Sequence, residues 1–247
     1  MNKKRLHALI TGGSNGIGAA TATLFAQAGY AVTIFYHQDH KNAKEIVSLL
    51  TAEGYEIQAR CVDIRKKEEV QLAVSESNLR YGAVDVLVSN AGIGSWKLFT
   101  DIADEEITKV IDVHIYGMIN IVRAVLPGMI SRKTGKIITV SSIWGMTGAS
   151  CEVIYSTAKA AVIGFTKALA KEVGPSNIHV NCVAPGVVST RMNQALSEED
   201  LSVLRDETPL GRIGQPEEIA ECIFFLASDK ASFFTGQVLS PNGGLVI

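Results

Sequence analysis

The feature that most constrains the fold is a short apolar run followed by a glycine-rich turn and a run of small residues. Residues 6–10 show no regular alternation of apolar and polar side chains, which is typical of a strand buried on both faces. The turn TGGSNGIG follows at 11–18. The small apolar residues at 19–28 predict a helix that packs closely on a sheet, and Gly29 is expected to end it.

The same alternation of strand and helix continues to the end of the chain. Further strands are predicted at 31–36, 56–62, 84–89, 136–141, 178–184 and 237–241. Further helices are predicted at about 41–53, 66–81, 104–130, 152–173 and 216–228, with interruptions of the long helix near Gly117 and Pro127. No linker or repeat divides the 247 residues. We expect an α/β fold over residues 1–247, a single doubly wound domain with a mostly parallel seven-stranded sheet flanked by helices.

Charge and cysteine content argue against several classes of function. The formal net charge of −2 at pH 7 gives no reason to expect nucleic acid or an anionic membrane as a partner. The four cysteines are widely spaced without a CxxC pair, so we interpret them as reduced, packed thiols, and no motif predicts a metal site. We expect a cytoplasmic protein, because the first residues lead into a strand and no apolar stretch reaches the roughly 20 residues of a membrane span.

Gly12, Gly16 and Gly18 lie in the turn between the first strand and the first helix. Glycine lets the backbone approach a phosphate, and a helix N-terminus offers unpaired N–H groups to an anion. In this context the triplet predicts a dinucleotide site, with a tight turn that needs glycine only for its geometry as the alternative. The spacing is G-x3-G-x-G and differs from the G-x-G-x-x-G of the ordinary dinucleotide fold.

A second candidate site is Ser142, Tyr155 and Lys159. If Tyr155 begins a helix, Tyr155 and Lys159 lie one turn apart on one face. A lysine ammonium beside the phenol is expected to lower the pKa of the tyrosine and make it a usable proton donor and acceptor. Ser142 follows a predicted strand, where open α/β sheets bind ligands. A YxxxK pair alone is usually a solvated pair, so its meaning depends on the glycine turn.

Taken together, these motifs resemble the short-chain dehydrogenase/reductase family, which implies a Rossmann-type fold. The motifs occur along the chain in the same order as in that family: TGGSNGIG, Asp63 after the third strand, NAG at 90–92, Ser142, Tyr155-xxx-Lys159 and Pro185-Gly186. The resemblance covers essentially the whole chain. The closing segment GRIGQPEEIAECIFFLASDKASFFTGQVLSPNGG is similar to the end of 3-oxoacyl-[acyl-carrier-protein] reductases and their near relatives.

The resemblance implies a nicotinamide cofactor and the residues around it. The phosphates and the adenosine ribose would lie against Gly12, Ser14, Asn15, Gly16, Ile17 and Gly18. Asp63 would accept a hydrogen bond from the adenine amino group, and Ile64 would pack on the ring. The adenosine-ribose side would be lined by Asn90, Ala91 and Gly92. The nicotinamide end would be held by Tyr155, Lys159, Pro185, Gly186, Val188 and Thr190.

The end of the second strand distinguishes the two nicotinamide cofactors. An acid there would bind the adenosine 2′-hydroxyl and repel a 2′-phosphate. Tyr36 occupies this position, His37 follows it, and no carboxylate occurs before Asp39. We therefore expect NADP(H), with NAD(H) as the alternative. Tyr36 and His37 would contact the cofactor, and the 2′-phosphate could be met by Ser14, Asn15, His37 and Lys41. The resemblance argues partly against NADP(H), because Asn15 is often arginine in relatives that use it.

The resemblance also implies hydride transfer that reduces a ketone to a secondary alcohol. Tyr155 would donate the proton, Ser142 would orient the carbonyl oxygen, and Lys159 would position the cofactor. Relatives carry an asparagine in the fourth helix that anchors a water in the proton relay, and the matching residue here is His114. Histidine can donate and accept hydrogen bonds and so could replace it. A packed core histidine is an equal alternative.

The substrate is left open by the sequence. The closing segment favours a 3-oxoacyl thioester on an acyl carrier protein, although of two positions tied to that partner in relatives, Lys133 is basic and Ser176 is not. The segment SSIWGMTGASCEVIYS resembles that of reductases that act on a 5-aminopentanone group of elongation factor P. Another carbonyl reductase is a further alternative. A sensor or scaffold that binds NADP without activity is the non-enzyme alternative. The family implies a homotetramer or homodimer.

The segment 189–212 is polar, helix-forming and placed just after a strand. We expect it to form a lid over the substrate, with Met192, Leu196 and Leu201 on its apolar side.

Overall fold

The computed structural model describes residues 5–193 and 197–247, and within them seven strands form one sheet in the order β3-β2-β1-β4-β5-β6-β7. Every neighbouring pair is parallel. The strands are β1 (His7–Thr11), β2 (Ala31–Tyr36), β3 (Ile57–Cys61), β4 (Val86–Ser89), β5 (Gly135–Val140), β6 (Ile178–Val183) and β7 (Val238–Leu239). The doubly wound α/β fold expected from the sequence is confirmed.

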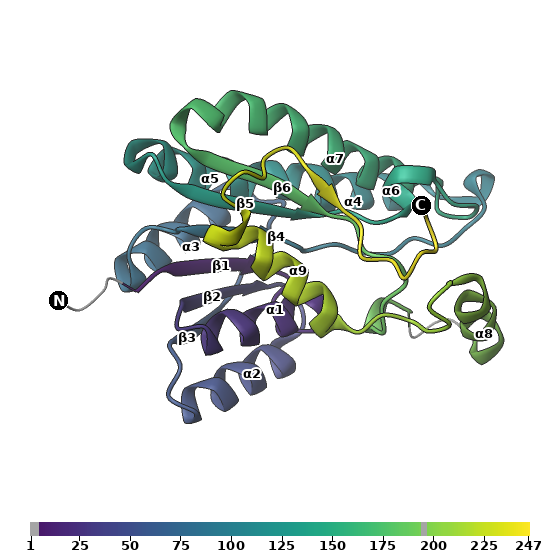
Figure 1. Ribbon diagram of the computed structural model, residues 1–247, viewed down its shortest axis with the longest axis horizontal. Coiled ribbons are helices and arrows are strands. Elements are labelled where there is room, and N and C mark those ends of the chain that lie inside the picture. Colours follow the sequence, from purple (N-terminus) through teal and green to yellow (C-terminus); the bar gives the residue numbers. More distant parts are fainter. Residues whose placement is uncertain (1–4, 194–196) are drawn as a thin grey trace.

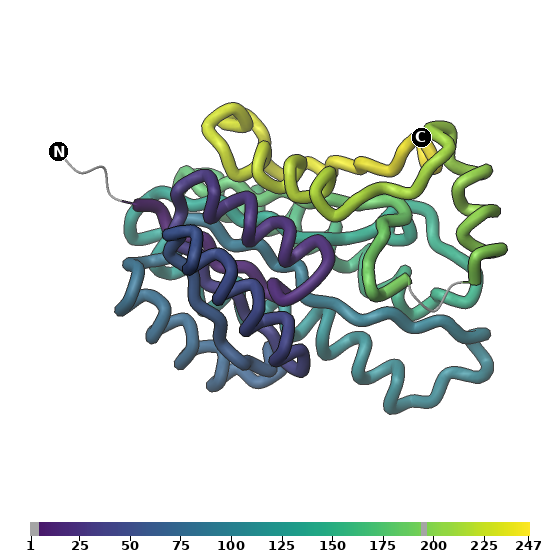
Figure 2. The backbone as a smooth tube through the Cα atoms, turned by 90° about the horizontal axis from the view of Figure 1, so that it is seen from below, coloured from purple at the N-terminus to yellow at the C-terminus, as the bar shows by residue number. Residues whose placement is uncertain are grey.

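Helices cover both faces of the sheet (Figures 1 and 2). One face carries α1 (Gly16–Gln27), α2 (His40–Ala52) and α9 (Pro216–Ala227). The other carries α3 (Lys67–Tyr81), α4 (Asp104–Ile111), α5 (Gly117–Arg132) and α7 (Val153–Val173). In β1, Ala8 and Ile10 enter the first core while Leu9 between them enters the second. Because both faces are buried, these strands are mostly apolar, with the polar residues His7 and Thr11 at the two ends of β1.

The predicted interruptions of the long helix are wrong in part. A π-helical segment (Asp112–Tyr116) joins α4 to α5, and α5 continues past Pro127 to Arg132. Proline removes one N–H from the helical ladder, and the buried side chains of Val125 and Met129 on either side hold the helix in place. Gly117 allows close packing instead of a break, because a Cβ there would lie 2.6 Å from Ile64 Cδ1.

The continuous run Asp104–Arg132 is long and apolar enough to cross a membrane by length and composition alone. In this fold it is a covering helix of the sheet, since α5 packs on α3 and β4, and α4 packs on α7.

Two further helices are short: one lies where the sequence predicts no element, and the other lies in the segment predicted to be helix-forming. The four residues of α6 (Trp144–Thr147) lie between β5 and α7, and α8 (Glu198–Glu207) lies in the expected lid. A capping box between Ser197 and Asp200 begins α8. Leu196, expected on the apolar side of the lid, lies outside the described residues.

Candidate functional site

The glycine turn lies at the carboxyl edge of the sheet, where β1 and β4 are neighbours but their helices cover opposite faces. Crevices at such reversals are where doubly wound sheets bind ligands. Gly12 (φ +66°) and Gly16 (φ +51°) adopt left-handed conformations that favour glycine. A Cβ on Gly12 would lie 2.9 Å from the Ala91 Cα, and a Cβ on Gly18 would collide with the Gly12 carbonyl oxygen. Glycine is therefore required here for close approach as well as for the turn.

The N-terminus of α1 retains its capacity to bind an anion. Its N-cap residue Asn15 makes no side-chain capping bond, and the first turn of this fully described helix carries no acidic side chain. Asn15 instead donates from Nδ2 to Asp39 Oδ2 at 2.9 Å. Unpaired N–H groups and the helix dipole at this end suit a phosphate. The residues present therefore fit the diphosphate of a dinucleotide.

Asn90 holds the turn against the end of β4. Its Nδ2 donates to the carbonyl oxygens of Thr11 (3.0 Å) and Gly12 (3.2 Å), and the Thr11 hydroxyl accepts from the backbone N–H groups of Asn90 and Ala91. The Asn90 side chain thus fixes the shape of the turn, a role that the sequence did not indicate.

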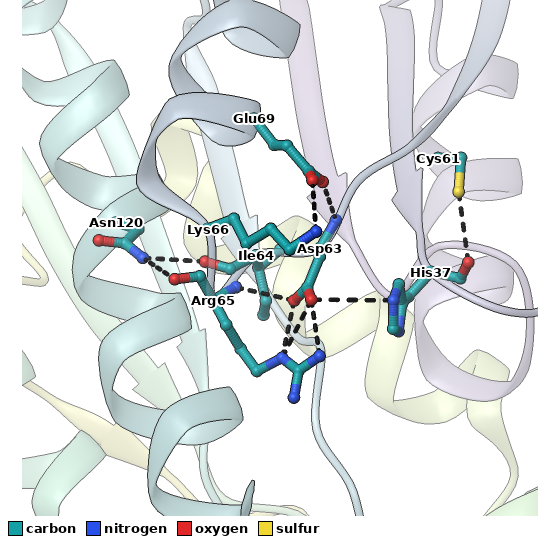
Figure 3. Close-up of polar contacts among 8 residues, drawn as sticks. All are labelled: His37, Cys61, Asp63, Ile64, Arg65, Lys66, Glu69 and Asn120. Carbon is teal, nitrogen blue, oxygen red and sulfur yellow. Dashed lines mark hydrogen bonds and ion pairs between the residues drawn. The ribbon is translucent and has the colours of Figure 1, made fainter.

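Asp63 lies at the end of β3, as predicted, but its carboxylate is engaged within the protein (Figure 3). Arg65 donates from Nε to Oδ1 at 2.8 Å and from Nη2 to Oδ2 at 2.6 Å. These bonds are the main reason that the pKa of Asp63 falls to about 2. His37 Nε2 lies 3.9 Å from Oδ2. An adenine amino group would share this carboxylate with Arg65.

Ile64 is buried against Gly117, and Asn120 Nδ2 donates to its carbonyl oxygen at 3.0 Å. Its expected contact with an adenine ring therefore stays a prediction.

Ser142, Tyr155 and Lys159 converge, although they come from two separate elements. Ser142 follows β5, while Tyr155 and Lys159 lie one turn apart on the buried side of α7. The Ser142 side chain lies near the Tyr155 hydroxyl and lowers its pKa, and the Ser142 hydroxyl accepts from the Trp144 backbone N–H at 3.2 Å. Lys159 Nζ lies 5.5 Å from the centre of the Tyr155 ring and donates to the Val140 carbonyl oxygen at 2.9 Å. All three side chains are buried, so water has little access to them.

The expectation that Lys159 lowers the pKa of Tyr155 is wrong for this geometry. Burial raises the pKa of Tyr155 above its ordinary value, the charge of Glu152 raises it further, and the Ser142 side chain only partly opposes them. Burial also lowers the pKa of Lys159 to about 8. The ammonium faces the ring and the Val140 carbonyl, and its charge does not offset the rise in the Tyr155 pKa. Tyr155 is therefore a protonated phenol near neutral pH.

His114 lies beside Tyr155 in the π-helical segment between α4 and α5. The two rings meet edge to face, with centres 5.5 Å apart. Its Nε2 lies 2.8 Å from the Ile93 carbonyl oxygen and 3.1 Å from the Ile93 nitrogen, so the bond it makes depends on the tautomer. Burial, with the charge of Lys159, lowers the pKa of His114 to about 3. His114 is thus a neutral ring that positions Tyr155, and its part in a proton relay stays a prediction.

Gly92 makes room for this histidine, because a Cβ there would lie 2.5 Å from His114 Cε1. The predicted role of Gly92 beside a ribose is a separate expectation that this packing does not test.

The segment after β6 lies against the glycine turn. A Cβ on Gly16 would be 3.2 Å from Thr190 Cγ2, so the two segments touch. Val188 is buried and pairs with Gly214 in an isolated parallel bridge. Pro185 is buried, and Gly186 packs so closely that a Cβ would lie 2.8 Å from the Asn242 Cα. The expected cofactor residues from both ends of the chain thus surround one edge of the sheet.

Glu152 is a residue of this site that the sequence analysis missed. It caps α7 three residues before Tyr155, a spacing that puts both side chains on one side of the helix. It is half-buried, and within residues 5–193 and 197–247 its carboxylate has no recorded ion pair or side-chain hydrogen bond. Burial raises the pKa of Glu152 to about 7. Its position relative to the tyrosine was the signal that could have found it.

The expected substrate side carries exposed apolar residues. Trp96, Met146 and Met192 are each about half exposed. The loop that carries Trp96 approaches the start of α7, since the Lys97 N–H donates to the Cys151 carbonyl oxygen at 2.9 Å. We call these three exposed apolar side chains the apolar rim.

Comparison with known proteins gives matches over almost the entire chain. A family model described as enoyl-(acyl carrier protein) reductase matches residues 12–246. A 3-oxoacyl-[acyl-carrier-protein] reductase FabG from Chlamydia muridarum is 41% identical over 238 residues, which are 96% of each chain. The protein of the same name from Thermotoga maritima is 41% identical over 241 residues, 97% of each chain. An uncharacterized oxidoreductase, YmfI, from Bacillus subtilis is 40% identical over 245 residues, 99% of each chain.

Proposed function

Because the chain belongs to the short-chain dehydrogenase/reductase family, a family of oxidoreductases that act on CH–OH and C=O groups, we propose that it reduces a ketone to a secondary alcohol with NADPH. The observation that carries this proposal is the convergence of the buried Ser142 and Tyr155 hydroxyls, with Lys159 Nζ 5.5 Å from the centre of the tyrosine ring. The pair is buried at the same edge of the sheet as a turn that fits a diphosphate.

The protein contributes geometry and a proton to this reaction. The nicotinamide supplies the hydride when it is bound. Tyr155 holds its proton near neutral pH, and it can donate that proton to a developing alkoxide because an alkoxide is a stronger base than a phenolate, even though burial raises the pKa of Tyr155. Ser142 offers a second hydroxyl to the same oxygen. Lys159, with a pKa of about 8, is charged at pH 7 and adds a positive field beneath the ring.

NADP(H) is favoured over NAD(H) by the end of β2. Tyr36 and His37 occupy the first positions there, and Asp39 already accepts hydrogen bonds from Asn15 and Asn42. A carboxylate that is already hydrogen-bonded is poorly placed to bind a ribose hydroxyl. A clear preference for NADH in kcat/KM would contradict this part of the proposal.

The first candidate substrate is a 3-oxoacyl thioester, which the names of the relatives and the apolar rim both support. Recognition of an acyl carrier protein has less support than the thioester, because the two positions tied to that partner do not lie beside Tyr155 of the same chain. Lys133 lies beside the turn that contains Ser176, since Asn177 Nδ2 donates to the Lys133 carbonyl oxygen. Both positions directly precede β5 and β6 and so lie at the amino edge of the sheet, opposite Tyr155.

The test is to follow NADPH consumption by the purified protein with a 3-oxoacyl thioester. Tyr155→Phe should lower kcat by at least about a hundredfold, the usual contribution of a positioned general acid, while NADPH still binds. Tyr55→Phe, which changes a tyrosine in the loop before β3, is the matched control and should be fully active. Turnover by Tyr155→Phe at the wild-type rate would refute the assignment.

A second candidate, a reductase of the 5-aminopentanone group on elongation factor P, is favoured by Glu152. A half-buried carboxylate without a cation partner among the described residues, beside the proton donor, would attract a substrate ammonium group. A 3-oxoacyl thioester has no ammonium group that the Glu152 carboxylate could bind.

An amino ketone and its uncharged isostere separate the two candidates. If Glu152 binds an ammonium, Glu152→Gln should lower kcat/KM for the amino ketone about tenfold to a hundredfold, the range for hydrogen bonds to charged groups, and leave the isostere unaffected. Glu105→Gln, which changes an exposed acid of α4, is the matched control. Equal losses on both ketones would count against the second candidate.

The assembly and the location complete the proposal. Exposed small residues on α7 (Ala160, Ala161, Gly164 and Ala168) leave a flat surface that suits helix pairing, in line with a homotetramer or homodimer. Light scattering that finds a stable monomer would contradict it. The four cysteines are free thiols, which suits the cytoplasm.

A further inference from the structure

Segments from three distant parts of the chain meet at one carboxylate, Asp39. Arg191, which follows β6, donates from Nη1 to Asp39 Oδ2 at 3.2 Å across 152 positions of sequence. Asn15 from the glycine turn and Asn42 from α2 donate to the same oxygen at 2.9 and 3.0 Å. We call Asp39, Asn15, Asn42 and Arg191 the Asp39 junction.

The Asp39 junction lies at the adenosine end of the expected cofactor site. Asp39 caps α2 three residues after Tyr36, which ends β2 and occupies the position where an acid would bind a ribose 2′-hydroxyl and repel a 2′-phosphate. The neighbour of Arg191, Thr190, packs on Gly16. A cavity of about 700 Å³ is lined by Asn15, Asn42 and Arg191 together with residues of α1 and α9. Arg191 therefore faces open space beside the phosphate turn.

The two charged groups of the junction differ in their remaining capacity for hydrogen bonds. Asp39 is 14% exposed and accepts from two side-chain amides, the Asn42 backbone N–H and Arg191. Burial raises the pKa of Asp39, and these donors outweigh burial and hold it below the ordinary value. Arg191 is 60% exposed, and its recorded bond uses one of its five N–H donors. The guanidinium is thus free to bind an anion, whereas the carboxylate is already engaged.

Other basic side chains near the end of β2 are less suited to this task. Lys41 lies on the exposed side of α2 and faces Glu45 at 3.9 Å. His37 faces Asp63, also at 3.9 Å. Within the described part of the chain, Arg191 is the cation that contacts the cap of α2 beside the glycine turn.

We propose that Arg191 recognises the adenosine 2′-phosphate of NADP(H), and that Asp39 serves to hold the guanidinium at that position instead of binding the ribose. The proposal rests on the proposed use of a nicotinamide cofactor. It makes the choice of cofactor depend on a residue of the segment after β6. A guanidinium suits this role because its planar set of donors matches a phosphate.

The test is direct nucleotide binding without substrate, followed by the fluorescence of NADPH and NADH. Arg191→Gln should weaken NADPH binding about tenfold to a hundredfold, the range for hydrogen bonds to a charged group, and change NADH binding less than about threefold. Arg191→Lys, which keeps the charge, should recover part of the loss. A melting curve confirms that each variant is folded.

Two further variants complete the test. Arg60→Gln removes an exposed guanidinium that pairs with Glu76 at 3.0 Å between β3 and α3, and it should change neither affinity. Asp39→Asn should retain NADH binding, because in this proposal the carboxylate binds Arg191 and does not bind the ribose. Loss of NADH affinity in Asp39→Asn, or equal effects of Arg191→Gln on both nucleotides, would overturn the proposal.

The outcomes also separate this proposal from the proposed function. Wild-type protein that binds neither nucleotide would refute the proposed function and the role of Arg191 with it. Wild-type protein that prefers NADPH, with an unchanged preference in Arg191→Gln, would refute the role of Arg191 alone.

Discussion

Replacing Asp63 with Asn tests the strongest charge pair near the expected adenine site. The Asp63 carboxylate is 8% exposed and binds Arg65 through both oxygens (Figure 3). Its pKa falls from 3.8 to about 2, which corresponds to about 2 kcal/mol of folding stability at pH 7. Because the folded-state pKa is the lower one, this stability is present above about pH 4 and is lost as the pH falls toward 2.

The assay is urea unfolding of cofactor-free protein at pH 7 and pH 3. Asp63→Asn should lower the free energy of unfolding by about 2 kcal/mol at pH 7, and the difference from wild type should fall to about half at pH 3. Glu76→Gln is the matched control, because it breaks an ion pair with Arg60 whose partners are both more than a third exposed. Pairs of that kind contribute at most about 1 kcal/mol.

Two results would refute this reasoning. If Asp63→Asn is as stable as wild type at pH 7, the Arg65 bonds do not stabilise the fold. If the loss is large but unchanged at pH 3, it comes from altered packing, because protonation of Asp63 in the unfolded state should by then have removed about half of the contribution of the charge.

Further predictions concern the surroundings of Tyr155. Gly92→Ala should lower the melting temperature by several degrees, because its Cβ would meet His114, whereas Gly164→Ala on α7, with no atom within 4 Å, should leave stability unchanged or raise it. Glu152→Gln should raise the melting temperature more at pH 8 than at pH 5. Burial raises the folded-state pKa of Glu152 to about 7, so at pH 8 the folded protein must hold a partly buried charge that the glutamine removes. An equal effect at both pH values would contradict this reasoning. The rate of ketone reduction should fall as the pH rises through about 8, where Lys159 loses its proton, and a rate that is flat from pH 7 to 9 would show that its charge is not needed.

Much of the fold could be predicted because its signals are local. The strands that form the middle of the sheet, such as β1 and β5, are continuous apolar runs, and the helices between them end at glycines or begin at proline. Prediction failed where tertiary packing overrides a local preference. Pro127 remains inside α5 because buried neighbours hold the helix, and β7 is shorter than expected because only Val238 and Leu239 pair with β6.

The candidate site was predictable to the extent that it is built from short spacings. Tyr155 and Lys159 lie four positions apart in one helix, so the sequence alone indicates that they share a face. Glu152, three positions before Tyr155, carries the same kind of signal and was missed because it belongs to no motif. That the Asn90 side chain holds the glycine turn was not predicted, and its expected place beside a ribose stays a prediction.

The sequence by itself determined the alternation of elements, the glycine turn and the identity of the Ser142, Tyr155 and Lys159 set, because each depends on residues close together in the chain. Only the tertiary structure decided what surrounds them. Burial makes Tyr155 a protonated phenol instead of a lysine-activated phenolate, and folding brings Arg191 to Asp39 across 152 positions. The physical reason is that burial and long-range contacts depend on the whole packed molecule, and no local pattern of residues encodes them.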